Sequence, residues 1–306
     1  MNARAKIKQM TPSSQNEVPK PRNDGTLACV LVLKAKPLVE QIQRELQKRI
    51  QRQKIRPKLC VVLVGNDPAS LLYTQRKGKL ASSLGIAHET FHFDANTSPE
   101  EVKQCIQKLN RNPKVHGILL QRPLPRSFLE EEVILWIDPS KDVDAFHPLH
   151  AGNLFLGHPT FQPCTPAGIM ALLKHYQINL LGKIACVVGR SSIVGKPMAS
   201  LLLQAHATVL QCHSQTTELE TMTQLAEVLV VASGKRHLIQ AQHVKEGAII
   251  IDVGIHKTPQ GIQGDVLYEE VALKASAITP VPGGVGPMTL AMLMQNTVMA
   301  AEQLEI

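Results

Sequence analysis

Residues 183–195 have the sequence KIACVVGRSSIVG, in which an apolar run is followed by a glycine-containing turn. The run predicts a buried strand over residues 183–188, and the residues after the turn predict a helix over 193–204. Gly189 and Gly195 would permit a tight turn and the close approach of a phosphate group, and N–H groups at the start of a helix bind anions. The segment departs from a strict G-x-G-x-x-G pattern, so its strand–turn–helix context is what indicates a nucleotide-binding unit.

Strands and helices alternate along the rest of the chain in the same way. Further strands are predicted at residues 59–64, 88–93, 115–120, 207–211, 227–232 and 248–252, and helices at 36–53, from a cap at Ser70 to Gly85, from Ser98 onward, and at 288–303. This alternation predicts mainly parallel sheets with helices on both faces, which is the α/β class. A length of 306 residues favours two such domains, with ligands at the carboxyl ends of the strands.

The residues after the predicted strand at 207–211 bear on the choice of cofactor. Cys212, His213 and Ser214 stand where an acidic residue would bind the free ribose hydroxyl groups of NAD. Arg190 and Ser214 would instead bind the 2′-phosphate of NADP. Taken separately, they could equally be a solvated arginine and a capping serine, so their joint position is what favours NADP.

Two segments far apart in the sequence carry further informative residues. In SLLYTQRKGK, residues 70–79, Tyr73 and Lys77 are four residues apart and share one face of the predicted helix. They could be a surface tyrosine and a solvated lysine. Neighbouring positive charges and partial burial would, however, lower the pKa of Lys77 and make it a usable base near neutral pH. The second segment, PVPGGVGPMT at residues 280–289, is rich in proline and glycine and predicts an unusual backbone path that can come close to a ligand.

Polar residues also lie near the predicted ends of other strands. Gln121 directly follows the strand at 115–120. In KDVD, residues 141–144, Asp142 and Asp144 alternate and would face opposite ways in an extended chain. One carboxylate can therefore point into a cleft while the other caps a turn or pairs locally.

Composition and charge exclude several classes of protein. Of the net charge of +8, half lies in residues 1–22, which hold five Lys or Arg and one Glu. We expect residues 1–25 to be a disordered basic tail, with a targeting peptide as the alternative. The remaining charge is too small to indicate nucleic-acid binding, and no apolar run is long enough to span a membrane. The six cysteines show no metal-binding or disulfide spacing, which indicates a reducing cytoplasm and no structural metal.

Taken together, these segments resemble the bifunctional methylenetetrahydrofolate dehydrogenase/methenyltetrahydrofolate cyclohydrolase family over residues 30–303. The resemblance is carried by Y-x-x-x-K-x-K at 73–79, Q-x-P-L-P at 121–125, KDVD at 141–144, PCTP at 163–166, VGRS at 188–191 and PVPGGVGPMT at 280–289. It implies a folate domain of residues 26–147 and 283–306 and a Rossmann-type NADP-binding domain of residues 148–282, with the substrate between them. It also implies a homodimer that serves one-carbon metabolism and purine biosynthesis.

The same resemblance implies the reaction and the residues that perform it. Methylenetetrahydrofolate would be oxidised with NADP to methenyltetrahydrofolate, which would then be hydrolysed to 10-formyltetrahydrofolate. Lys77 would be the catalytic lysine, held by Gln121, and Asp144 would bind the pterin. The other implied contacts are Tyr73, Pro282, Gly283 and Gly286 with folate, and Gly189, Arg190, Ser191, Ser214 and Ile255 with NADP.

Three positions depart from the family's usual residues. Arg122 stands where an apolar residue is usual beside the folate ring, Ala145 replaces a glycine, and His150 replaces an asparagine. One alternative is therefore a dehydrogenase whose cyclohydrolase activity is weak or absent because of Arg122. A second alternative, a catalytically silent folate- or nucleotide-binding relative, is disfavoured because Lys77 and Asp144 are both present.

Overall fold

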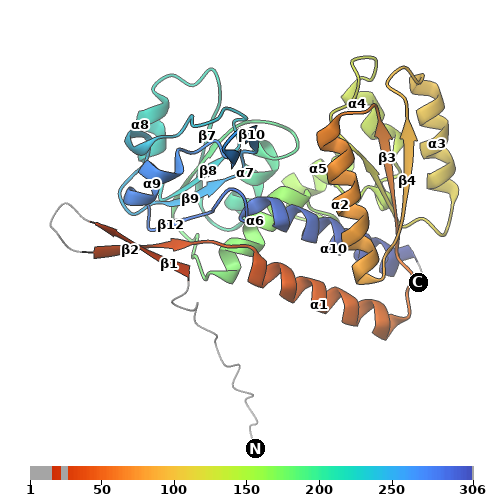
Figure 1. Cartoon of the computed structure of the whole chain (residues 1–306), viewed down its shortest axis with the longest axis horizontal. Coiled ribbons are helices and arrows are strands. Elements are labelled where there is room, and N and C mark those ends of the chain that lie inside the picture. The colour runs from red at the N-terminus through yellow and green to blue at the C-terminus, as the bar shows by residue number, and fades with distance from the viewer. Residues whose placement is uncertain (1–15, 22–26, 305–306) are drawn as a thin grey trace, which may run out of the picture.

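The computed structural model describes residues 16–21 and 27–304, which form two α/β lobes (Figure 1). The first lobe has a three-stranded parallel sheet in the order β4-β3-β5, formed by Ala87–Phe93, Lys58–Val64 and Gly117–Leu120. The central strand β3 is apolar and buried along nearly its whole length, because neighbours cover it on both edges and both faces. Helices α2 (Pro68–Leu84), α3 (Pro99–Arg111) and the short α4 (Glu130–Val133) belong to this lobe.

The second lobe has a seven-stranded sheet in the order β1-β2-β12-β9-β8-β6-β7. In that order the strands are Glu17–Pro21, Leu27–Val32, Ala277–Ile278, Ile249–Asp252, Val228–Val231, Ile184–Val188 and Thr208–Cys212. All neighbours are parallel except β1 and β2. Helices α7 (Gly195–Gln204), α8 (Leu219–Gln224) and α9 (Tyr268–Lys274) accompany this sheet, together with a hairpin of β10 (His256–Thr258) and β11 (Gly261–Gln263). The predicted α/β class with two domains is confirmed.

Four helices connect the lobes: α1 (Lys36–Gln53), α5 (Pro148–Phe155), α6 (Cys164–His175) and α10 (Val285–Leu304). The C-terminal helix α10 packs against α6, α1 and the strands β3 and β5 of the first sheet. A Cβ atom at Gly168 would lie 2.8 Å from that of Met288, so glycine allows α6 and α10 to approach closely. The end of the chain therefore returns to the first lobe after the second sheet is complete.

The local signals at the ends of α2 explain its bounds. Asp67 caps the helix by accepting a hydrogen bond from the backbone N–H of Ser70 at 2.8 Å, and Pro68 occupies the first turn. The prediction that Ser70 is the cap was wrong, because the aspartate three residues earlier supplies the capping oxygen. Gly85 ends the helix with a φ of +82°, in the left-handed region that glycine adopts without strain.

Two expectations about the N-terminal region need correction. Part of the expected disordered tail, Glu17–Pro21, forms β1 and pairs with β2 in antiparallel register, whereas residues 1–15 and 22–25 lie outside the described residues. Residues 27–32 fall within the range expected for the first domain, 26–147, but they form β2, which pairs in parallel with β12 and so belongs to the second sheet. Among the described helices, none is both long enough and apolar enough to cross a membrane.

Candidate active site

A cavity of about 140 Å³ lies where α2, the end of β5, α6 and α10 meet. The residues that line it come from segments more than two hundred positions apart: Tyr73, Lys77, Leu120, Gln121, Arg122, Asp144, Phe146, Cys164, Thr165, Thr289, Leu290 and Leu293. The cavity therefore collects the amine, the amide and the carboxylate that the sequence indicated.

Lys77 is held rigidly at this cavity. Its side chain is buried, and Nζ donates a hydrogen bond of 2.8 Å to Oε1 of Gln121. The Gln121 amide in turn donates through Nε2 to the carbonyl oxygen of Arg122 at 2.6 Å, which turns Oε1 toward the amine. One helical turn before Lys77, the ring of Tyr73 lies with its centroid 5.4 Å from Nζ, as their spacing on α2 predicts.

The electrostatics of the cavity favour proton exchange. Burial lowers the pKa of the Lys77 amine, although the negative charge of Asp144 opposes this effect. Burial likewise raises the pKa of the Asp144 carboxyl, and the positive charge of Lys77 opposes it. An amine and an acid whose pKa values both move toward neutrality are suited to exchange protons with a bound substrate or water.

The two carboxylates of the KDVD segment have separate tasks, as their alternation predicted. Asp142 is buried and accepts a hydrogen bond from the backbone N–H of His147 at 2.7 Å, so it fixes the following turn. Asp144 faces the cavity. The buried amine of Lys141 donates to the carbonyl oxygens of residues 109, 110 and 112, and so ties the segment to the end of α3.

A second pocket of about 320 Å³ adjoins the first. We call this second pocket the outer pocket and the first one the inner cavity. Tyr73 and Leu290 line both cavities and form the border between them. One wall is the start of α2, and the other is made by residues 252–255, by Lys257 and by the proline- and glycine-rich loop at 280–287. Gly283 has a φ of +112°, which only glycine adopts without strain. The predicted contacts Pro282, Gly283, Gly286 and Ile255 all line this outer pocket.

The turn after β6 has the close packing that a nucleotide-binding turn requires. Gly189 has a φ of +133°, and a Cβ atom there would overlap the carbonyl oxygen of Ala232. A Cβ atom at Gly195 would overlap the backbone of Gly189. Oγ of Ser191 accepts hydrogen bonds from the N–H groups of residues 194 and 195 at 3.2 and 3.3 Å, which ties the turn to the first residue of α7. Positions 189 and 195 of this turn therefore admit only glycine, and a turn of this kind at the start of a helix is typical of phosphate-binding sites.

The two residues predicted to select NADP lie just past the ends of the neighbouring strands β6 and β7. The strands are parallel with Val188 opposite Cys212, so Arg190 and Ser214 each lie two residues past a paired position. Both are exposed, and the residues between β7 and Ser214 include no acidic side chain. The donor set at these strand ends thus fits a 2′-phosphate, because a guanidinium and a hydroxyl both donate hydrogen bonds to phosphate oxygens.

Arg122 lines the inner cavity and forms an ion pair with Glu130. Its Nη1 atom is 2.7 Å from Oε2 of Glu130, and its guanidinium carbon lies 5.1 Å from the ring centroid of Phe146. The other two positions that differ from the family's usual residues, Ala145 and His150, have structural roles. Ala145 has a φ of +60°, which accounts for the usual glycine there, and the buried His150 ring contacts the carbonyl oxygen of Pro139 at 2.8 Å.

Sequence reasoning missed several residues of the inner cavity. Cys164, Thr165 and Thr289 line it, and the hydroxyl groups of Thr165 and Thr289 are 2.9 Å apart. Thr165 lies in the segment 163–166 and Thr289 in the segment 280–289, both of which stood out in the sequence. Their contact could not be predicted, however, because the two residues are 124 positions apart and no local pattern indicates that they meet. Within residues 16–21 and 27–304, no group of three or more His, Cys, Asp or Glu side chains is arranged to hold a metal ion.

Comparison with known proteins identifies the family to which this site belongs. The model of the tetrahydrofolate dehydrogenase/cyclohydrolase catalytic domain matches residues 33–144, and that of the corresponding NAD(P)-binding domain matches residues 163–305. The bifunctional protein FolD of Acetivibrio thermocellus is 50% identical over 275 residues, which cover 89% of this chain and 96% of that protein.

Solved structures agree with the sequence relatives. The bifunctional FolD methylenetetrahydrofolate dehydrogenase/cyclohydrolase of Campylobacter jejuni superposes with a TM-score of 0.87 at 45% identity, over 90% of this chain and 99% of that one. The Trypanosoma brucei dehydrogenase-cyclohydrolase, solved with NADP and an inhibitor, has a TM-score of 0.85 at 31% identity, over 90% and 98% of the two chains. The chain therefore belongs to the tetrahydrofolate dehydrogenase/cyclohydrolase family.

Proposed function

We propose that this chain oxidises 5,10-methylenetetrahydrofolate with NADP and hydrolyses the methenyl product to 10-formyltetrahydrofolate in one continuous crevice. The observation that carries the proposal is the meeting of Lys77 and Asp144 in a cavity that adjoins the pocket of Ile255 and the loop at 280–287. The family models and the relatives support both activities.

For the oxidation, the chain's task is alignment. NADP, when bound, accepts the hydride from the methylene carbon. Asp144 binds the amino group and ring nitrogen of the pterin, and the Tyr73 ring stacks on the folate. Pro282, Gly283, Gly286 and Ile255 line the adjoining outer pocket. In this proposal the first three contact folate and Ile255 contacts the nicotinamide. The reaction needs little acid–base help because the folate nitrogens stabilise the cation that forms.

For the hydrolysis, Lys77 handles the protons. Water adds to the methenyl carbon, and a proton of that water passes to the neutral Lys77 amine. The hydroxyl oxygen then loses its second proton and forms the C=O bond while the bond from this carbon to the pterin nitrogen N5 breaks, N5 takes up one proton, and the formyl group stays on N10. One proton is released overall. Gln121 holds the amine in place through the 2.8 Å hydrogen bond.

The pairing of Arg122 with Glu130 supports the bifunctional enzyme over a dehydrogenase without hydrolysis. A guanidinium that is already ion-paired and stacked on Phe146 is held by these partners, so the cavity beside Lys77 remains open.

The proposal is tested by following NADP reduction with methylenetetrahydrofolate as substrate and then measuring formyltetrahydrofolate. In a second assay, added methenyltetrahydrofolate should disappear at a rate proportional to enzyme. Hydride transfer without this hydrolysis would favour the single-activity alternative, and failure of both would exclude the proposal.

We also propose a cytoplasmic homodimer that supplies formyl groups to purine biosynthesis. Strand β4 supports the dimer, because among the described strands it pairs with β3 alone and presents a free edge. Six free cysteines are consistent with a reducing compartment. Light scattering of the purified protein gives the assembly mass, and cell fractionation gives the compartment.

A further inference from the structure

Three neighbouring strands of the second sheet end along one row of paired residues. Val188 of β6 pairs with Val231 of β8, and Val231 pairs with Asp252 of β9. The glycine turn after β6 therefore lies beside the loop after β8, which in turn lies beside the loop after β9. The first of these contacts is close, because a Cβ atom at Gly189 would overlap the carbonyl oxygen of Ala232. Only the loop after β8 thus separates the glycine turn from the loop after β9.

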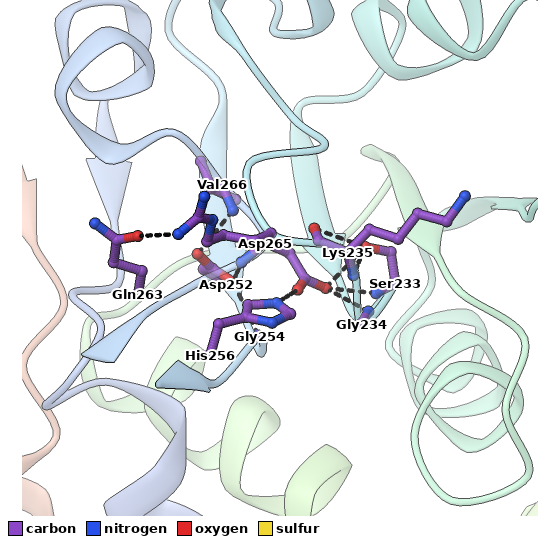
Figure 2. Close-up of polar contacts among 10 residues, drawn as sticks. Ser233, Gly234, Lys235, Asp252, Gly254, His256, Gln263, Asp265 and Val266 are labelled. Atoms are coloured by element: carbon purple, nitrogen blue, oxygen red, sulfur yellow. Dashed lines mark hydrogen bonds and ion pairs between the residues drawn. The ribbon is translucent and has the colours of Figure 1, made fainter. Parts of the chain in front are cut away.

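One buried carboxylate joins the loops after β8 and β9 (Figure 2). Oδ2 of Asp265 accepts hydrogen bonds from the N–H groups of Ser233 and Gly234 at 2.6 and 2.8 Å, and from the hydroxyl group of Ser233 at 2.9 Å. Oδ1 lies 2.7 Å from Nε2 of His256, which donates to it because an ionised carboxylate only accepts. Asp265 has no exposed surface, so both of its oxygens depend on these partners.

The packing around Asp265 leaves this arrangement little freedom. A Cβ atom at Gly254 would overlap the side chain of Asp265, and a Cβ atom at Gly264 would overlap the carboxylate of Asp252. Both oxygens of Asp252 also accept hydrogen bonds. They bind the N–H groups of Gly254, Asp265 and Val266 at 2.9, 2.9 and 3.0 Å. The loop after β9 is therefore fixed to the segment that carries Asp265.

The two sides of this network lead to different parts of the cofactor site. His256 directly follows Ile255, which is exposed and lines the outer pocket. Ser233 directly follows Ala232, which packs against the glycine turn. In the proposed function Ile255 contacts the nicotinamide, and the glycine turn binds the phosphate groups of NADP. Neither His256 nor Asp265 lines the inner cavity or the outer pocket, so both would act through these neighbours.

We infer that Asp265 and His256 are positioning residues for hydride transfer, because they fix Ile255, and with it the nicotinamide, relative to the turn that holds the phosphate groups. This inference rests on the proposed function. Hydride transfer requires the donor carbon and the nicotinamide in close contact, and a displacement of about 1 Å can cost a factor of about 100 in rate. Hydrolysis does not use the nicotinamide, because Lys77 acts on the methenyl carbon in the inner cavity. Loss of the contact between His256 and Asp265 should therefore slow oxidation and spare hydrolysis.

The test removes the hydrogen bond of His256 and then restores it. His256→Met keeps much of the side-chain volume but has no donor, whereas His256→Gln places an amide N–H group near the position of Nε2. In His256→Met we expect kcat for NADP reduction to fall about tenfold or more. Hydrolysis of methenyltetrahydrofolate, assayed without NADP, should keep the wild-type rate, and His256→Gln should recover most of the oxidation rate. The ratio of oxidation to hydrolysis is measured in one preparation, so it does not depend on the fraction of protein that is folded.

Ser233→Ala tests the other oxygen of Asp265. This variant removes the hydroxyl contact but leaves both N–H groups in place, so the chain should fold. The ratio of oxidation to hydrolysis should fall here too, by a smaller factor than in His256→Met.

Thr258→Val is the matched control. Thr258 lies on β10, as His256 does, but its hydroxyl group forms hydrogen bonds within the turn of the hairpin. The control therefore loosens the same hairpin without touching Asp265, and it should leave the ratio of oxidation to hydrolysis unchanged. An unchanged ratio in His256→Met, a His256→Gln variant that recovers nothing, or an equal effect of Thr258→Val would overturn the inference.

Calorimetric titration with NADP and with adenosine 2′,5′-bisphosphate separates this inference from the proposed function. The bisphosphate carries the 2′-phosphate but has no nicotinamide. In His256→Met the dissociation constant for NADP should rise about threefold or more, as the loss of one contact would give, and that for the bisphosphate should stay unchanged. If the wild-type protein turns over no folate, the proposed function fails, and these two constants still decide whether His256 positions the nicotinamide. Equal changes in the two constants, or no change in either, would rule this out.

Discussion

The side-chain amine of Lys77 donates to the amide oxygen of Gln121 across 2.8 Å, inside a cavity that also contains Asp144. The amide cannot rotate freely, because its nitrogen donates to the carbonyl oxygen of the next residue at 2.6 Å. The amine is thus held by a neutral partner rather than by an ion pair. A neutral partner allows the lysine to lose its proton more easily than a carboxylate would.

Replacement of the lysine should separate binding from hydrolysis. In Lys77→Ala we expect hydrolysis of methenyltetrahydrofolate to fall by about a hundredfold or more, as is typical when a general acid–base group is lost. Folate should still bind, because Tyr73 and Asp144 remain. The decay of methenyltetrahydrofolate absorbance measures the rate, and calorimetry measures binding. Lys79→Ala, on another face of α2, should hydrolyse at the wild-type rate. Wild-type hydrolysis by Lys77→Ala would refute the assignment of Lys77.

The pH dependence of hydrolysis should follow the neutral form of Lys77. Because burial lowers the pKa of this amine, the rate should rise with pH through a midpoint below the ordinary lysine value of 10.5. Gln121→Glu places a carboxylate beside the amine, which raises its pKa and should move the rising limb to higher pH. Gln121→Met adds no charge and serves as the control. Profiles of kcat/KM for the three proteins that coincide would show that another group titrates.

Substitutions at the C-terminal ends of two helices should have opposite effects on stability. Gln177 follows α6 with a φ of +56°, whereas Gly85 follows α2 with a φ of +82°, and a Cβ atom at Gly85 would meet nothing. A left-handed backbone costs an ordinary residue about 1–2 kcal/mol, and glycine loses about 0.5–1 kcal/mol in chain entropy. Gln177→Gly should therefore raise the free energy of unfolding in urea by about 0.5–1 kcal/mol, and Gly85→Ala should lower it by a similar amount. Shifts of the same sign in both variants would contradict this reasoning.

Local pattern was enough to predict much of the fold. The apolar runs at 59–64 and 183–188 predicted β3 and β6 to within a residue, because a buried parallel strand is apolar on both faces. The alternation of Asp142 and Asp144 predicted that only one of them faces the cavity. In each case the structure is decided by residues within a few positions of one another.

Contacts between distant segments could not be predicted in the same way. Val30 and Val32 of β2 are buried, as apolar residues in a strand should be, but nothing in their local sequence predicts that the neighbouring strand is β12, some 250 residues later. Lys141 lies in a segment that the sequence singled out, yet its amine binds carbonyl groups at the end of α3 rather than a ligand. Arg122 was expected to affect the folate slot, and its pairing with Glu130 depends on how the chain turns after β5.

Cofactor choice should depend on the two exposed side chains at the ends of β6 and β7. In Arg190→Ala we expect KM for NADP to rise about tenfold or more, because a charge-assisted contact with the 2′-phosphate is lost. Ser214→Asp should weaken NADP further by repulsion and should improve the use of NAD, whose ribose hydroxyl groups an acidic residue binds. KM and kcat for both cofactors measure the effect, and Arg236→Ala, on a different loop, is the charge-matched control. If NADP and NAD lose affinity equally in Arg190→Ala, this arginine supports the fold of the turn, and the 2′-phosphate must be recognised elsewhere.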